Sequence, residues 1–94
     1  MNLHEMFEEF EEEYIKFDRI DNPPSKRPDI CAFLLIDKLL PGNGDIISAS
    51  EHDEIYLDVD CEKFEKLVTK EDIIYLSRCG VHYDEDTDSL SMFT

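Results

Sequence analysis

The first apolar positions of the chain repeat with the period of a helix. On a helical wheel they fall within one arc of about 100°: Leu3, Met6, Phe7, Phe10, Tyr14 and Phe17. Glutamates occupy the opposite side, and Asn2 precedes the run with a side chain suited to capping a helix. The pattern predicts a helix that Asn2 caps and that runs to about Phe17, with an apolar inner face and an acidic outer face.

A break and a second helix follow. The segment 22–25 contains two prolines, which end a helix because proline has no backbone N–H and its ring clashes with the preceding turn. Residues from Pro28, a residue type suited to a first helical turn, to about Leu40 are apolar on most sides. We expect this helix to be the most buried one. A buried strand over 30–36 is the alternative, but the helical period continues to Leu40.

The period changes to two in the second half of the chain. Apolar and polar residues alternate from Ile55 to Val59, which predicts a half-buried strand. The segment 45–50 precedes it and is expected to pair with it through a turn at 51–53.

Two short helices are predicted next. Asp60 is placed to cap a helix over 61–68. Thr69 and Asp72 have the spacing of a capping box for another helix, although glutamate or glutamine is usual in the second position. Gly80 is suited to end that helix.

A closing hairpin is predicted from Val81–Asp84 and 90–93 around a turn at 85–88. The order of elements is therefore α-α-β-β-α-α-β-β. Because strands and helices do not alternate singly, we expect an α+β fold, with an antiparallel sheet packed against helices. No internal repeat or linker divides the sequence, so residues 1–94 are expected to form a single domain.

Charge narrows the range of partners. The 94 residues include 24 acidic and 9 basic ones, a net charge of −15. A protein that binds nucleic acid directly needs the opposite sign, and so does a helix that lies on an anionic membrane. The longest apolar run, 30–36, is far shorter than the roughly 18 residues needed to span a bilayer. The N-terminal residues lack the pattern of a secretory signal, so we expect a cytoplasmic protein.

Metal sites are incompletely matched. Three aspartates share the spacing of the first ligands in a calcium loop: Asp84, Asp86 and Asp88. Ser89 then stands where that loop requires glycine. Cys79 and His82 are two of the three or four ligands that zinc needs, and the three cysteines include no CxxC pair. We therefore expect no metal and reduced thiols.

Catalytic patterns are weaker still. His52 is flanked by carboxylates that suit a proton shuttle, but no nucleophile lies at a diagnostic spacing. The sequence contains no GxSxG, P-loop or dinucleotide fingerprint. We expect no enzymatic activity and no cofactor.

The carboxylates gather in three clusters, at 5–13, 51–62 and 84–88. Residues 5–13 would span about 12 Å of helix axis, over which duplex DNA carries about seven phosphate charges. We therefore expect a stoichiometric inhibitor or adaptor that occupies the basic groove of a nucleic-acid-handling protein. The residues expected to contribute most to binding are Glu8, Glu9, Glu12, Glu13, Glu54 and Asp58.

In size and charge, the chain resembles small acidic inhibitors: anti-CRISPR and anti-restriction DNA mimics of phages, and immunity proteins that neutralise basic nucleases. These groups share no motif that can be placed on this sequence. The resemblance therefore implies a DNA-mimic type of inhibition and transfers neither a fold nor a site.

The alternative is a structural or housekeeping domain that is acidic for solubility and forms a homo-oligomer. Ile15 is the feature that suggests it, because this residue falls on the acidic side of the predicted first helix. Either way, close carboxylates repel one another, which should raise their pKa values on average. The protein should then melt at a higher temperature near about pH 5 than near about pH 8 at low salt.

Overall fold

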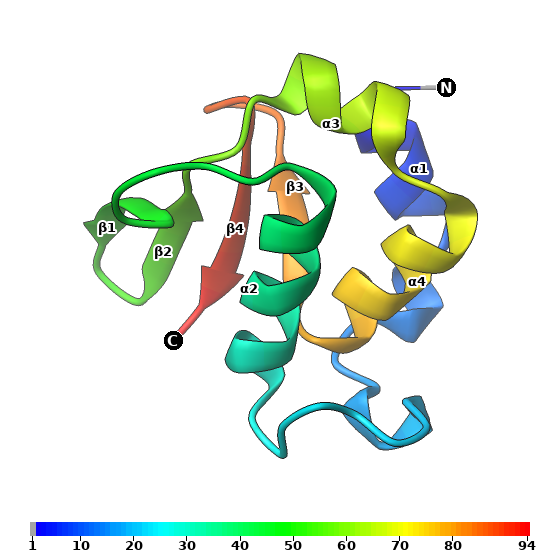
Figure 1. Cartoon of the computed structure of the whole chain (residues 1–94). Helices are drawn as coiled ribbons and strands as arrows, with labels where there is room; N and C mark the ends of the chain where they lie inside the picture. The colour runs from blue at the N-terminus through cyan, green and yellow to red at the C-terminus, as the bar shows by residue number, and fades with distance from the viewer. Residues whose placement is uncertain (1) are drawn as a thin grey trace.

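Residues 2–94, which the computed structural model describes, form helices around an antiparallel sheet (Figure 1). The helices are α1 (Leu3–Glu9), α2 (Pro28–Leu39), α3 (Cys61–Leu67) and α4 (Lys70–Arg78), with 3-10 turns at Glu11–Glu13 and Phe17–Arg19. The strands are β1 (Ile47–Glu51), β2 (Glu54–Leu57), β3 (Val81–Asp84) and β4 (Ser89–Phe93). The fold is α+β, and the predicted order of elements is confirmed.

The sheet has the order β1-β2-β4-β3, so two sequential hairpins meet through β2 and β4. In Figure 1, α2 and α4 lie beside the β4–β3 end, and α3 lies across the end that carries the β3–β4 turn. Burial follows this arrangement: Val81, Leu90 and Met92 belong to the core, whereas every residue of β1 is exposed. The β3–β4 end of the sheet therefore carries most of its packing.

Most short-range predictions are confirmed. The side chain of Asp60 accepts a hydrogen bond from the Lys63 N–H (3.2 Å) and caps α3. Thr69 and Asp72 form both hydrogen bonds of the predicted capping box. Gly80 follows α4 with a φ of +93°, a left-handed conformation that glycine adopts without the steric cost of a side chain.

The predicted length of the first helix is wrong. α1 ends at Glu9, and the chain continues through the 3-10 turn Glu11–Glu13. Like charges three and four residues apart weaken a helix, and the acidic run from Glu8 to Glu13 places several such pairs in succession. Beyond them, the Ile15 N–H donates to the Ser77 carbonyl at the end of α4 (2.9 Å), which redirects the chain.

The prediction that α2 is the most buried helix is also wrong. α4 contacts α1, α2, β3 and both 3-10 turns, and it buries Ile73, Leu76 and Ser77. The longer α2 packs along one side, and Leu34 on another side is 52% exposed. Because the sequence is apolar on most sides, it predicted the most buried helix, but within residues 2–94 the side of α2 that carries Ile30 and Leu34 stays exposed.

The predicted strand bounds need smaller corrections. β2 ends at Leu57 rather than at Val59, because the Val59 N–H turns back to the Leu57 carbonyl (2.9 Å). β1 begins at Ile47, two residues later than expected, and continues to Glu51. The turn between the two strands lies at 52–53, inside the predicted segment.

Candidate acidic binding face

Acidic side chains from α3 and from the β3–β4 turn line one hollow at the end of the sheet, beside the start of α1. The hollow, of about 320 Å³, lies between the start of α1, the start of α3 and the β3–β4 turn. Its lining includes four carboxylates and no lysine or arginine: Glu62, Glu65, Glu85 and Asp88. With the adjacent Glu8, these residues make up what we name the acidic face.

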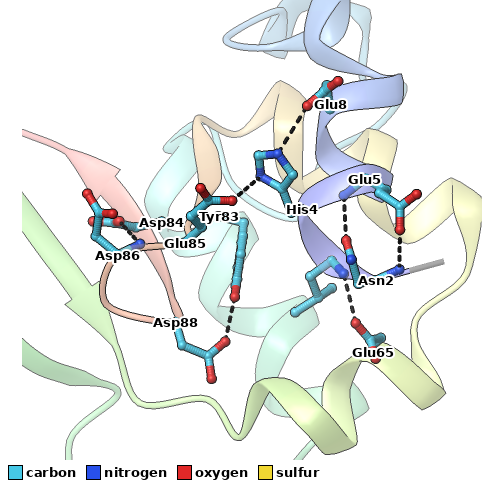
Figure 2. A network of polar contacts seen from close by, with 11 residues as sticks. Asn2, His4, Glu5, Glu8, Glu65, Tyr83, Asp84, Glu85, Asp86 and Asp88 are labelled. Atoms are coloured by element: carbon cyan, nitrogen blue, oxygen red, sulfur yellow. Dashed lines mark hydrogen bonds and ion pairs between the residues drawn. The ribbon is translucent and has the colours of Figure 1, made fainter.

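His4 connects the two sides of the acidic face (Figure 2). Its Nε2 atom lies 3.1 Å from a carboxylate oxygen of Glu8, one turn further along α1. Its Nδ1 atom lies 3.4 Å from a carboxylate oxygen of Glu85 in the β3–β4 turn. The imidazole therefore joins the first helix to the last hairpin.

Two carboxylates, Glu65 of the acidic face and Glu5, accept hydrogen bonds at the start of α1. The Glu65 side chain on α3 accepts a hydrogen bond from the Leu3 N–H (2.8 Å), and Glu5 completes a capping box with Asn2 (Figure 2). Carboxylates are favourable at this position because the N-terminal end of a helix is partially positive. The caps thus fix where the helices begin and bring Glu65 beside α1.

The β3–β4 turn uses its aspartates as hydrogen-bond acceptors. The Asp86 N–H donates to Asp84 (2.9 Å), and the Tyr83 hydroxyl donates to Asp88 (2.6 Å). The hydrogen bond to Asp88, followed by desolvation, raises the pKa of Tyr83 to about 12. Within residues 2–94, no three histidine, cysteine, aspartate or glutamate side chains converge in a way that would hold a metal ion.

The six predicted binding residues do not form one surface. Glu8 belongs to the acidic face, while Glu9 and Glu12 are exposed without a recorded ion pair in the described part of the chain. Asp58 follows β2 and lies at a groove beside α2. The lining of that groove contains no residue of α1, so Asp58 and Glu8 belong to different surfaces.

Glu13 has a different surrounding from the other predicted glutamates. Its carboxylate receives hydrogen bonds from Arg78 on α4 (2.9 Å) and from Arg19, and its side chain is only 19% exposed. Hydrogen bonds from the Arg78 and Arg19 guanidinium groups hold its pKa below the ordinary value. This direction is opposite to the average shift expected from repulsion, so Glu13 is neutralised within the fold.

Glu54 is also engaged internally, in a cluster that the sequence did not reveal. The Ser91 hydroxyl donates to Glu54 (2.9 Å) and lies 2.7 Å from Nε2 of His82. The strand register explains this proximity, because Ser91 on the central β4 pairs with His82 on β3 and with Tyr56 on β2.

This cluster does not have the geometry of a serine–histidine–carboxylate relay. In such a relay the carboxylate orients the second ring nitrogen of the histidine. Here Glu54 lies 3.5 Å from the same Nε2 atom that Ser91 approaches, and Nδ1 of His82 is buried without a hydrogen bond in the described structure. Ser91 is fully buried, so its hydroxyl has no access to a substrate.

The three cysteines are buried as free thiols. Burial, and next the neighbouring Cys31, raises the pKa of the Cys79 thiol to about 12. Burial likewise raises the pKa of Cys61 to about 11. Both thiols are thus poor sources of the thiolate that binds metals or attacks substrates.

The four lining carboxylates of the acidic face, and His4 beside them, were missed as binding candidates from sequence: Glu62, Glu65, Glu85 and Asp88. Two signals were present: the turn at 85–88 was one of the acidic clusters, and the helix caps set the register of α1 and α3. Neither signal shows which of the acidic clusters lie next to each other in the folded chain. The predicted first helix placed its glutamates on one continuous face, whereas the shorter α1 leaves only its first turns beside α3.

Comparison of the chain with family models, with curated proteins and with solved structures found no match. Among residues 2–94, no helix has both the length and the apolar character needed to cross a membrane.

Proposed function

We propose that this chain is a non-catalytic inhibitor or adaptor of DNA-mimic type, whose acidic face occupies a basic, nucleic-acid-handling surface of a partner protein in the cytoplasm. The supporting observation is the hollow beside α1, whose lining carries four carboxylates and no lysine or arginine. The carboxylates come from segments far apart in sequence, so folding concentrates charge that the chain itself spreads out.

The placement of basic residues adds to this charge imbalance. Arg19 and Arg78 are held by Glu13, and Lys70 lies over the Phe10 ring at 5.8 Å from its centroid. Lys66 lies at 4.0 Å from Glu62, and both side chains are largely exposed, so this ion pair is well solvated. A long-range attraction for a positively charged surface follows, which accelerates encounter and weakens with salt.

The test is capture of partners from a host lysate at low and at high salt, with duplex DNA added as a competitor. We expect basic nucleic-acid-handling proteins to be retained at low salt, and released both by about 0.5 M salt and by the duplex. A triple variant, Glu8→Gln/Glu62→Gln/Glu85→Gln, should retain them poorly.

The matched control is Glu9→Gln/Glu12→Gln/Glu51→Gln, which removes the same charge from exposed positions outside the hollow. Equal loss in both triple variants would mean that net charge acts without a defined face. Partners that are neutral or acidic, and whose capture does not change with salt, would contradict the proposal.

A second function is supported by one apolar patch. Ile15 is 66% exposed and Phe93 is 59% exposed, and both border a hollow of about 400 Å³. We propose as the alternative that this patch joins copies of a structural domain. Light scattering should then report a dimer that Ile15→Asp dissociates, whereas a monomer at all concentrations would contradict it.

A further inference from the structure

The segment that leads from the C-terminal end of α2 to β1 passes over the top of α2 and toward the β1–β2 hairpin (Figure 1). A groove lies between this segment and α2. Its volume is about 440 Å³. The Asp58 N–H donates to the Ile46 carbonyl (2.6 Å), which ties this connecting segment to the end of β2. We name this hollow the α2 groove; its lining shares no residue with that of the acidic face.

Apolar side chains form the inner part of the α2 groove. Phe33, Leu40 and Ile46 are half-buried in it, and Ile30 and Leu34 on α2 are exposed beside them. An isolated exposed leucine is ordinary on a protein surface, but a contiguous apolar hollow is typical of a binding site.

Carboxylates surround this apolar surface. Asp37 on α2, Asp45 in the connecting segment and Asp58 after β2 are all exposed and line the groove, and its lining contains no lysine or arginine. Lys38 is the nearest basic residue in sequence, but it lines the hollow on the other side of Leu34. The three aspartates come from different segments, so only the folded chain assembles this combination.

We propose that the α2 groove binds a short segment of a partner protein in which an apolar side chain lies between lysine or arginine residues. Charge complementarity selects this occupant. The three aspartates of the lining attract a basic segment and repel acidic peptides and anionic lipid surfaces. This site goes beyond the proposed function, because it stands whether or not the acidic face binds a partner.

The probe is an amphipathic peptide of about twelve residues built from leucine and lysine, titrated into the isotopically labelled full chain and followed by NMR. We expect the amide shifts to concentrate in residues 30–46 and at Asp58. A peptide with serine in place of leucine should bind at least about tenfold more weakly, and one with glutamate in place of lysine should not bind.

The chain offers a matched pair of variants. Leu34 is 52% exposed in the α2 groove, and Leu67 on α3 is 49% exposed outside it. Leu34→Ser should weaken peptide binding at least about tenfold, whereas Leu67→Ser should leave it unchanged. Melting curves should show that both variants fold. We expect this because both leucine side chains are about half exposed and contribute little to the core.

The double variant Asp45→Asn/Asp58→Asn removes two negative charges from the α2 groove while keeping the size of the side chains. It should weaken binding and reduce its dependence on salt, while the backbone hydrogen bond from residue 58 remains. Peptide binding that maps to the acidic face, or that is unaffected by Leu34→Ser, would overturn the assignment. Equal binding of the serine-substituted peptide would also overturn it. The last two results would leave capture of basic proteins by the acidic face untouched, whereas peptide binding at the acidic face would support that capture.

Discussion

Two glutamate-rich regions of this protein differ in what surrounds their carboxylates. Glu13 is held between Arg19 and Arg78 and is largely covered. Glu8, five residues before Glu13 in the chain, lies on the acidic face, where it contacts His4. The two residues belong to one acidic run in the sequence, yet one joins α4 to the N-terminal segment and the other remains at the surface.

The comparison shows that an acidic run need not act as a unit. The repulsion among its members disfavours a continuous helix, and one member gains a specific contact from the arginines. A positively charged partner would contact Glu8 together with the carboxylates of α3 and the β3–β4 turn. It would not contact Glu13, whose charge the arginines neutralise. Substitution of Glu13 and the dependence of stability on pH test this division.

The largest effect is expected from Glu13→Gln. It removes the charge that neutralises the half-buried Arg78, and a poorly solvated cation without its counter-ion is costly. The melting temperature should fall by more than in Glu12→Gln, which changes the neighbouring exposed residue. Equal melting temperatures of the two variants would show that the arginine contacts contribute no stability, and the distinction between the regions would be lost.

A smaller effect, and in the opposite direction, is expected from Ile15→Asn, which should increase the stability of the fold. Ile15 has a φ of +55°, which is strained for a β-branched side chain and is better tolerated by asparagine. Relief of this strain should stabilise the fold by about 1 kcal/mol, measured by calorimetry. Ile47→Asn on β1, which has no such backbone strain, is the control and should bring no gain. A loss in Ile15→Asn would mean that apolar contacts of Ile15, such as that beside Gly80, outweigh the strain.

The smallest and most condition-dependent effect is the response to pH. The folded pKa of Glu13 is depressed, so its contribution is present above the unfolded pKa of about 4.3 and is lost as pH falls through the folded value. The stability difference between the wild-type chain and Glu13→Gln should therefore stay constant from about pH 8 to pH 5 and shrink only below about pH 4.

Net repulsion among the 24 acidic residues of the chain, which face 9 basic ones, opposes folding when the carboxylates are ionised. The wild-type chain should melt at a higher temperature near about pH 5 than near about pH 8 at low salt, and about 0.5 M salt should narrow this gap. The triple variant Glu8→Gln/Glu62→Gln/Glu85→Gln should show a smaller gap. A melting temperature that does not rise from pH 8 to pH 5 would show that repulsion among the carboxylates contributes little in this range.

Sequence patterns predicted the local parts of this fold well. The caps at Asn2, Asp60 and Thr69, and the stop at Gly80, each depend on residues within a few positions of one another. The closing hairpin was predicted for the same reason, since turn residues and alternation lie next to each other in the chain. The length of the first helix failed because Ile15 bonds to Ser77, which is distant in sequence.

The same distinction between short-range and long-range features applies to the candidate site. The sequence by itself determined the net charge of −15, the acidic clusters, the apolar character of α2 and the α+β order, because these depend on composition and on short-range periodicity. Only the tertiary structure decided that Glu13 and Glu54 are engaged internally and that Glu62, Glu65 and Glu85 meet beside α1. It also decided that one side of α2 stays uncovered. The physical reason is that charge neutralisation and burial depend on which distant segments pack together, and neither periodicity nor local capping carries that information.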